Sequence, residues 1–189
     1  MKKILTVLVF VVFALACNAQ TQHMKFKGIP MEGTLRSFVE KLKAKGYTYL
    51  GTEDGMATLN GEFAGAKGCT VVVESFPDRD QVSQVIVMFP EEKTWNGVYG
   101  LYSFYKDRLT EKYGAPDAVE RFADGEPSDD FSKFYKLTSD ECHYMSTFMT
   151  DNGKIMLTMF GSGMEACVAI SYVDEANAEE TRSRVMEDL

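Results

Sequence analysis

The hydrophobic residues of this chain follow a helical period in two segments and a strand-like alternation in most of the others. Apolar residues at positions i, i+3, i+4 and i+7 predict a first helix with one apolar face: Leu35, Phe38, Val39 and Leu42. A longer stripe of the same period predicts a second helix: Trp95, Val98, Tyr99, Tyr102, Tyr105, Leu109 and Tyr113. Thr34 is the expected N-cap of the first helix, and Gly46 and Gly114 are the expected stops.

Strand-like runs fill the segments between and after these helices. The run "MKFKGI" predicts one short strand, and Asp54-Gly55 and Asn60-Gly61 are expected to break the segment 47–65 into strands. Two strongly apolar strands, "CTVVVESF" and "QVSQVIVMF", are expected to form a hairpin through residues 77–80. After the second helix the expected elements are strands at 133–137 leading into 142–150, at 155–160 and at 167–172, and a polar helix at 174–189.

The entrances of the two helices resemble each other. The segments "PMEGTL" (30–35) and "PEEKTW" (90–95) share Pro, Glu and Thr at the same spacing, and each follows a strand. This similarity predicts an internal repeat. We therefore expect one α+β domain over 20–189, built from two helix-plus-antiparallel-strand halves (about 24–89 and 85–173), with helices covering one face of the sheet.

The first helix entrance also has the glycine spacing of a phosphate-binding loop, with Gly28 and Gly33 in a G-x-x-x-x-G arrangement. A nucleotide-binding loop needs Lys after its second Gly, followed by Ser or Thr. Thr34 and Leu35 occupy those positions, and Glu32 places a negative charge inside the loop. The segment is therefore predicted to turn a strand into a helix, and no cofactor is predicted.

The N-terminus has the pattern of an export signal. Lys2 and Lys3 precede an almost wholly apolar run at 4–15, and small residues follow before a cleavage position after Ala19. We predict a signal peptide at 1–19 and a periplasmic or secreted mature chain. The segment around Cys17 also resembles a lipobox, so a lipid anchor through Cys17 is the alternative.

Composition narrows the classes of partner. The chain is 45% hydrophobic and 12% aromatic, which is typical of a globular protein. Its formal net charge of −8 disfavours nucleic acid and anionic lipid surfaces as partners. Beyond the export signal the sequence has no second long apolar segment, so we expect no membrane span.

Reactive side chains form no recognisable catalytic or metal-binding motif. Cys142 and His143 are neighbours on a predicted strand, so their side chains face opposite sides and cannot form a nucleophile–base pair. The acidic loop 123–130 lacks the calcium-binding pattern, and no His/Cys spacing offers a zinc site. Two predicted hairpins place Ser146 opposite Met159 and Met159 opposite Cys167. This register keeps Cys142 apart from Cys167, while the disulfide status of Cys69, Cys142 and Cys167 as a set is left open.

The aromatic residues of the second helix are the candidate ligand-binding residues: Trp95, Tyr99 and Tyr102, with Tyr105 beside them. They can form a surface for a glycan or a protein. The competing interpretation is that the same stripe packs the helix on the sheet, since it is the helix's only apolar face. Exposure of the Trp95 ring would favour a partner site.

Several segments resemble small secreted proteins of unknown function from Bacteroidetes: "NAQ", "FKGIPMEGTLRSFVEKLKAKGY", "LTEKYGAP", "TDNGKIMLTMF" and "VAISYVD". The tandem helix-and-sheet layout is similar to that of the beta-lactamase inhibitor protein. These resemblances imply an exported α+β domain and supply no reaction.

The sequence as a whole favours an exported, non-catalytic binding protein whose partner is a protein or an envelope component. A secreted hydrolase that uses scattered carboxylates is one alternative, and an inhibitor of a secreted enzyme is another. The oligomeric state is left open.

Overall fold

The computed structural model describes residues 22–188, so the predicted export signal and Cys17 lie outside the described residues. The helices are α1 (Leu35–Ala44), α2 (Trp95–Tyr113), α3 (Asp130–Thr138) and α4 (Glu175–Asp188). The strands are β1 (Lys25–Phe26), β2 (Ile29–Pro30), β3 (Thr48–Glu53), β4 (Met56–Phe63), β5 (Ala66–Ser75), β6 (Val82–Met88), β7 (Asp117–Phe122), β8 (Cys142–Thr150), β9 (Gly153–Ser162) and β10 (Glu165–Asp174). Among these residues, no helix is both long and apolar enough to cross a membrane.

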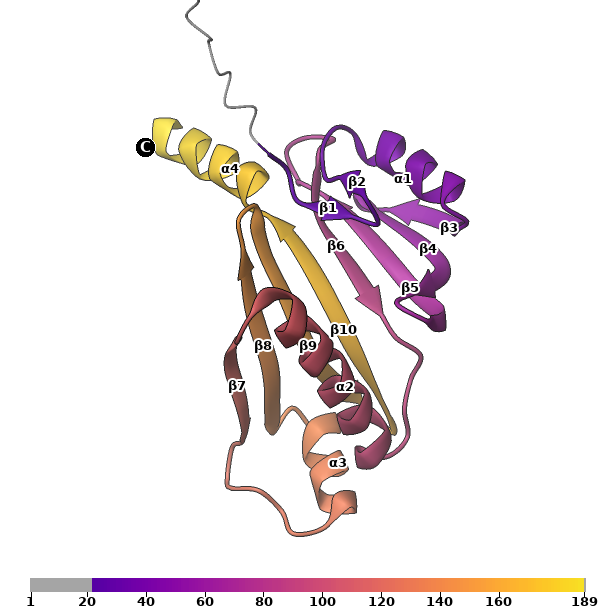
Figure 1. The fold of residues 1–189 in the computed structure, drawn as a ribbon, viewed down its shortest axis with the longest axis vertical. Coiled ribbons are helices and arrows are strands. Elements are labelled where there is room, and N and C mark those ends of the chain that lie inside the picture. The colour runs from indigo at the N-terminus through magenta and orange to yellow at the C-terminus, as the bar shows by residue number, and fades with distance from the viewer. Residues whose placement is uncertain (1–21, 189) are drawn as a thin grey trace, which may run out of the picture.

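Eight of the strands form a single antiparallel sheet in the order β3-β4-β5-β6-β10-β9-β8-β7 (Figure 1). Consecutive strands are neighbours throughout, except where β6 pairs with β10 in the middle of the sheet. Strands β1 and β2 form a separate small hairpin. The fold is therefore mixed α and β with more strand than helix, and its sheet is antiparallel as the sequence predicted.

One face of the sheet is buried under helices. Cross-strand pairing places a row of buried residues on this face: Leu59, Val71, Val87, Ile170, Leu157 and Ser146. Helix α1 packs against β3 and β5, and α2 and α3 pack against β8, β9 and β10. We call this the covered face. Helix α4 continues from the end of β10 and projects beyond the sheet (Figure 1).

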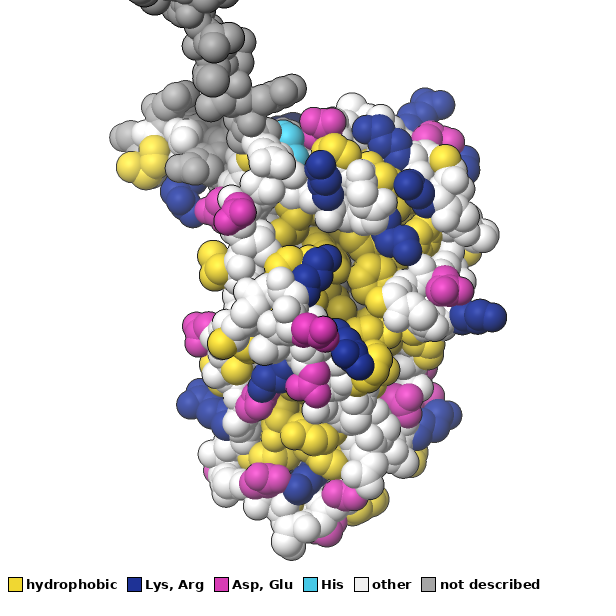
Figure 2. All heavy atoms as spheres, viewed as in Figure 1, with side chains coloured by type: hydrophobic (Ala, Val, Ile, Leu, Met, Phe, Trp, Pro, Cys, Tyr) yellow, Lys and Arg dark blue, Asp and Glu magenta, His cyan; other side chains and the backbone are white. Residues whose placement is uncertain are grey.

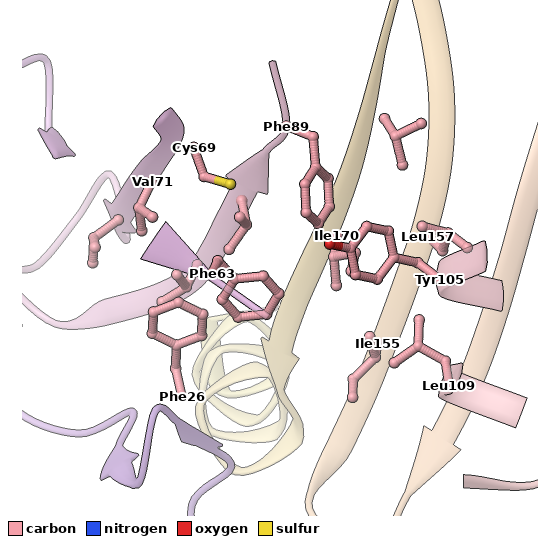
Figure 3. Packing of buried hydrophobic residues seen from close by; sticks show 14 of the residues in the cluster. Phe26, Phe63, Cys69, Val71, Phe89, Tyr105, Leu109, Ile155, Leu157 and Ile170 are labelled. Atoms are coloured by element: carbon pink, nitrogen blue, oxygen red, sulfur yellow. The ribbon is translucent and has the colours of Figure 1, made fainter. Parts of the chain in front are cut away.

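Aromatic rings connect the N-terminal hairpin to α2 across the covered face. Phe26 stacks on Phe63 with ring centroids 5.7 Å apart, Phe63 meets Phe89 edge-on at 6.1 Å, and Phe89 stacks on Tyr105 at 4.3 Å. Figure 3 shows these rings between the strands and α2. Because such ring pairs stabilise a core beyond their buried area, they hold the hairpin, the sheet and the helix together.

The predicted helix ends are confirmed. The Thr34 hydroxyl accepts a hydrogen bond from Ser37 N at 3.2 Å, and Thr94 accepts one from Gly97 N at 3.1 Å. Each cap satisfies a backbone donor that the first turn leaves without an intrahelical partner. Beyond the two helices, Gly46 and Gly114 have positive φ values of 94° and 87°, which glycine adopts without steric cost.

The predicted strand at 133–137 was wrong, because these residues belong to α3. The Asp129 side chain caps this helix by accepting a hydrogen bond from Ser132 N at 2.9 Å, and Lys136 lies in its last turn. The aromatic residues of the segment gave it a strand-like appearance. Strand β7 was missed, because an exposed edge strand needs little hydrophobic alternation.

One turn prediction and one strand prediction were also wrong. Asn60-Gly61 lies inside β4, and the turn follows at Ala64-Gly65. Gly61 serves a close contact instead: a Cβ there would lie 2.4 Å from Tyr47 Cδ1. The run "MKFKGI" is not one strand but the β1–β2 hairpin, which turns at Lys27 and Gly28, both with positive φ.

The predicted registers of both hairpins were wrong, by two residues between β8 and β9 and by one residue between β9 and β10. Thr150 pairs with Gly153, so Tyr144 lies opposite Met159, where Ser146 had been expected. In the next hairpin Cys167 lies opposite Phe160. A one-residue shift, as between β9 and β10, brings the opposite alternating set of positions into pairing, so the structure was needed to fix which side chains share a face.

Candidate functional site

The predicted aromatic cluster belongs mainly to the core. Trp95 and Tyr102 are buried, with 5% and 1% of their surface exposed, while Tyr99 is 41% exposed. The Trp95 ring stacks on Tyr99 at 5.4 Å and meets Tyr144 edge-on at 5.6 Å. These contacts pack α2 on the sheet, and the Trp95 ring offers no exposed surface for a partner.

A buried polar network lies beneath α2. The Tyr102 hydroxyl lies 2.7 Å from Ser146 Oγ and donates to Glu120 Oε1 at 2.9 Å. Lys106 forms an ion pair with the same carboxylate. Burial raises the pKa of Tyr102. The phenol therefore stays protonated and serves as a fixed donor that aligns the helix with the sheet.

The histidines and cysteines within residues 22–188 form no reactive group. Cys142 is buried and His143 is exposed on the opposite side of β8, as strand geometry predicts. His23 Nδ1 lies 3.2 Å from Asp174 Oδ1, so this imidazole contacts a carboxylate. Cys69, Cys142 and Cys167 are free thiols. Burial raises the pKa of Cys142 and of Cys167 to about 11, which suppresses the nucleophilic thiolate.

The carboxylates of the acidic loop are engaged in structural contacts. In the acidic loop, Asp129 caps α3, Glu126 pairs with Lys133 at 2.6 Å, and Asp124 lies 3.7 Å from Lys136. No group of three His, Cys, Asp or Glu side chains suited to a metal ion occurs within 22–188.

One carboxyl pair does come together at the surface. A hydrogen bond with Glu165 raises the pKa of Glu91, and a hydrogen bond from Lys93 lowers the pKa of Glu165. Glycoside hydrolysis uses carboxyl groups about 5 to 9.5 Å apart on two sides of a cleft. Glu91 and Glu165 are instead hydrogen-bonded to each other beside Lys93 and are solvent-exposed.

The sheet face opposite the helices carries no helix of the described chain, and we call it the open face. Cross-strand pairing defines its central rows. The first row consists of Thr70, Met88, Ala169, Thr158, Met145 and Val119. The second row consists of Thr58, Val72, Ile86, Ser171, Met156 and Thr147. Each row crosses six strands, which is about 24 Å at the usual spacing between strands.

The open face combines apolar side chains with an absence of charge at its centre. The residues given for the two central rows are uncharged, although 25% of the whole chain is charged, and Asp117 on the edge strand β7 continues the second row. Met145 and Val119 are about two-fifths exposed, and flanking positions on the same face are more so, with Met149 at 67% and Phe160 at 46%. Depletion of charge and enrichment in Met are typical of the centres of protein interfaces.

Sequence reasoning missed the open face. Its signal was present: β8 and β9 carry apolar residues on both alternating sets of positions, including Met145, Met149, Met156 and Phe160. Two apolar sets on one strand mean that both faces are apolar, whereas a strand with one solvated face alternates apolar with polar residues. Only the tertiary structure shows which of the two alternating sets of side chains has no helix packed on it.

No family model, curated protein or solved structure matches this chain significantly.

Proposed function

We propose that this chain is an exported, non-catalytic binding protein that docks a folded protein of the cell envelope through the open face. The uncharged double row at the centre of that face is the observation that carries the proposal. A broad and weakly charged surface with flexible Met side chains suits another protein surface. The acidic-loop carboxylates serve in a helix cap and ion pairs, and Glu91 and Glu165 lie exposed beside Lys93, which favours binding over hydrolysis.

Export is part of the proposal and is supported by the sequence of residues 1–19. Intact mass of the protein purified from its native host tests it. A mature chain beginning at Gln20 is expected. A diacylglyceryl adduct on Cys17 would show the lipid-anchored alternative, and retention of residues 1–19 would contradict export.

We also propose that the two halves of the chain are copies of one unit. Helix α1 is followed by the four-stranded series β3–β6, and α2 is followed by β7–β10, with α3 inserted after β7. The equivalent caps at Thr34 and Thr94 support the same offset. An alignment of related sequences that gave no similarity between the halves at this offset would contradict the repeat.

Site-specific photocrosslinking tests the open face. Benzoylphenylalanine replaces Met145 on the open face, and in the control it replaces Phe131, which is 81% exposed on α3. After incubation with envelope extract, we expect one major protein adduct from the Met145 position that is absent from the Phe131 position. The variant Met156→Lys should remove this adduct, because an uncompensated charge at an interface centre is costly.

Equal adduct patterns from the two positions, or no adduct at Met145, would overturn the docking proposal. An adduct between two copies of the chain, with a dimer by light scattering, would make a second copy the partner in place of an envelope protein. Inhibition of a lysozyme or a beta-lactamase that Met156→Lys abolishes would identify the partner as a secreted enzyme.

A further inference from the structure

The covered face contains a groove that the helices leave open. It lies between the C-terminal half of α2 and the N-terminal hairpin, over β10. Two adjoining cavities of about 400 Å³ and 270 Å³ share Lys112, Tyr113 and Tyr172 in their walls, and we describe them together as the groove. Figure 2 shows a hollow lined by hydrophobic side chains on this side of the molecule, with basic side chains at its edge. Its size is within the range of small-molecule sites.

The inner wall of the groove is apolar, and its side chains are held in place by packing. Ile170 and Leu109 are buried at its floor, and Phe63 belongs to the aromatic row that connects the hairpin to α2. Phe104 forms the outer wall and is 50% exposed. A ligand with an apolar body would therefore meet a preformed surface and would order few side chains on binding.

The charged residues that line the groove all have one sign. Lys25, Arg108 and Lys112 line it, and the described residues that line the two cavities include no Asp or Glu. Lys112 Nζ lies 4.9 Å from the Tyr113 ring centroid, and the Arg108 guanidinium lies 5.4 Å from that of Phe104. Arg108 also contacts Glu111, outside the groove, in a solvent-exposed ion pair. A local excess of cations in a chain of net charge −8 favours an anionic ligand.

Two phenol groups add hydrogen-bond donors beside Lys112. Tyr113 and Tyr172 line both cavities, and neither hydroxyl has a hydrogen-bond partner among the described side chains and backbone. Burial raises the pKa of Tyr172, so its hydroxyl keeps its proton at neutral pH. Phenol O–H groups and a lysine ammonium in the same walls match the oxygens of a carboxylate or a phosphate monoester.

We infer that this groove binds a small amphipathic anion, with its head at Lys112 and the two tyrosine hydroxyls and its apolar chain along Phe63, Phe104 and Leu109. The inference does not rest on the proposed docking function, because the groove and the open face lie on opposite sides of the sheet. A single-chain lipid with a carboxylate or phosphate head has this chemistry.

Calorimetric titration with ligands of equal chain length tests the inference: decanoate, decyl phosphate and 1-decanol. We expect saturable binding of at least one anion and about tenfold weaker binding of the alcohol, since a charge-assisted hydrogen bond contributes roughly one order of magnitude in affinity. The stronger of the two anions identifies the head group. Lys112→Met should weaken anion binding about tenfold and leave 1-decanol within about twofold.

Two further variants separate the head from the chain. Phe104→Ala should weaken the anion and the alcohol by the same factor, about threefold, because it removes apolar contact alone. Lys41→Met on α1 makes the same change in net charge away from the groove and should leave both affinities unchanged. Absence of saturable anion binding, equal affinity for 1-decanol, or equal effects of Lys112→Met and Lys41→Met would overturn the inference. The substituted lysines and Phe104 are exposed, so circular dichroism should show folded variants.

Discussion

The two faces of the sheet are completed in different ways. On the covered face, the residues that point out of the strands meet the apolar stripes of α1 and α2 and the aromatic row through Phe63 and Phe89. On the open face, the corresponding positions carry Met, Thr, Ser and Val, and no helix of the described chain packs on them. The covered face stabilises the fold, while the open face retains apolar surface that stability does not require. Surface of that kind is the best place to look for function.

Adjacent residues of β8 give the largest contrast. Phe148 points into the covered face with 1% of its surface exposed, and Met149 points outward with 67% exposed. Phe148→Ala should lower the free energy of unfolding by about 3–5 kcal/mol because it leaves a cavity. Met149→Ala should change it by less than about 0.5 kcal/mol. Urea denaturation of both variants measures the difference, and similar losses would show that both faces belong to the core.

The polar network under α2 gives the next effect. Tyr102→Phe removes the hydroxyl that contacts Ser146 and Glu120, and leaves the buried Ser146 Oγ without that partner. We expect a loss of about 1–3 kcal/mol in the free energy of unfolding. The double variant Tyr102→Phe with Ser146→Ala should lose less than the sum of the single variants, because both ends of one hydrogen bond are removed. Strict additivity would contradict the coupling. On the open face, Thr147→Val is the matched control and should be nearly neutral.

Alkaline pH should weaken the covered face in particular. Burial raises the pKa of Tyr144 from 10.0 to about 12, so the folded state holds this proton more tightly than the unfolded chain does. The resulting stability is fully present below pH 10 and is lost as pH rises through about 12. Between pH 8 and pH 11, wild type should lose about 1 kcal/mol more than Tyr144→Phe. Denaturant titrations at the two pH values measure this, and equal losses would contradict the raised pKa.

Thiol labelling should give the smallest effect and separate the faces kinetically. Cys167 is on the open face and partly exposed, whereas Cys142 is buried on the covered face. At pH 8 the pKa of about 11 leaves Cys167 with about a hundredfold less thiolate than an unperturbed thiol. We expect slow modification of the native protein, first at Cys167. Mass-spectrometric peptide mapping identifies the order in which the thiols react. Faster labelling of Cys142 than of Cys167 would contradict the assignment of Cys167 to the open face.

The helices were predictable because their signals are local. The stripe from Leu35 to Leu42 and the caps at Thr34 and Thr94 depend on residues within a few positions of one another. The prediction of a strand at 133–137 was wrong because the aromatic residues of this segment show no clear periodic pattern. The segment belongs to α3, which the Asp129 side chain caps. The Asn60-Gly61 turn was wrong because a distant ring, Tyr47, explains the glycine.

The candidate site was less predictable than the fold. Trp95, Tyr99 and Tyr102 were visible in the sequence as an aromatic cluster, but two of the three are buried. The open face combines residues from strands distant in the chain, and the groove combines residues of β10 with residues of α2. The register error of two residues between β8 and β9 changes which side chains lie beside one another, so the sequence could not select Met145 and Met156 as neighbours.

The sequence by itself determined an antiparallel α+β fold, the positions of α1 and α2, and an acidic composition without a reactive motif. These properties follow from local periodicity, capping and residue counts. Only the tertiary structure decided which apolar residues remain uncovered and where Lys25, Arg108 and Lys112 gather, because both depend on strand register and on the central pairing of β6 with β10. Pairing between distant strands is set by the packing of the whole core, and no short stretch of the chain specifies it.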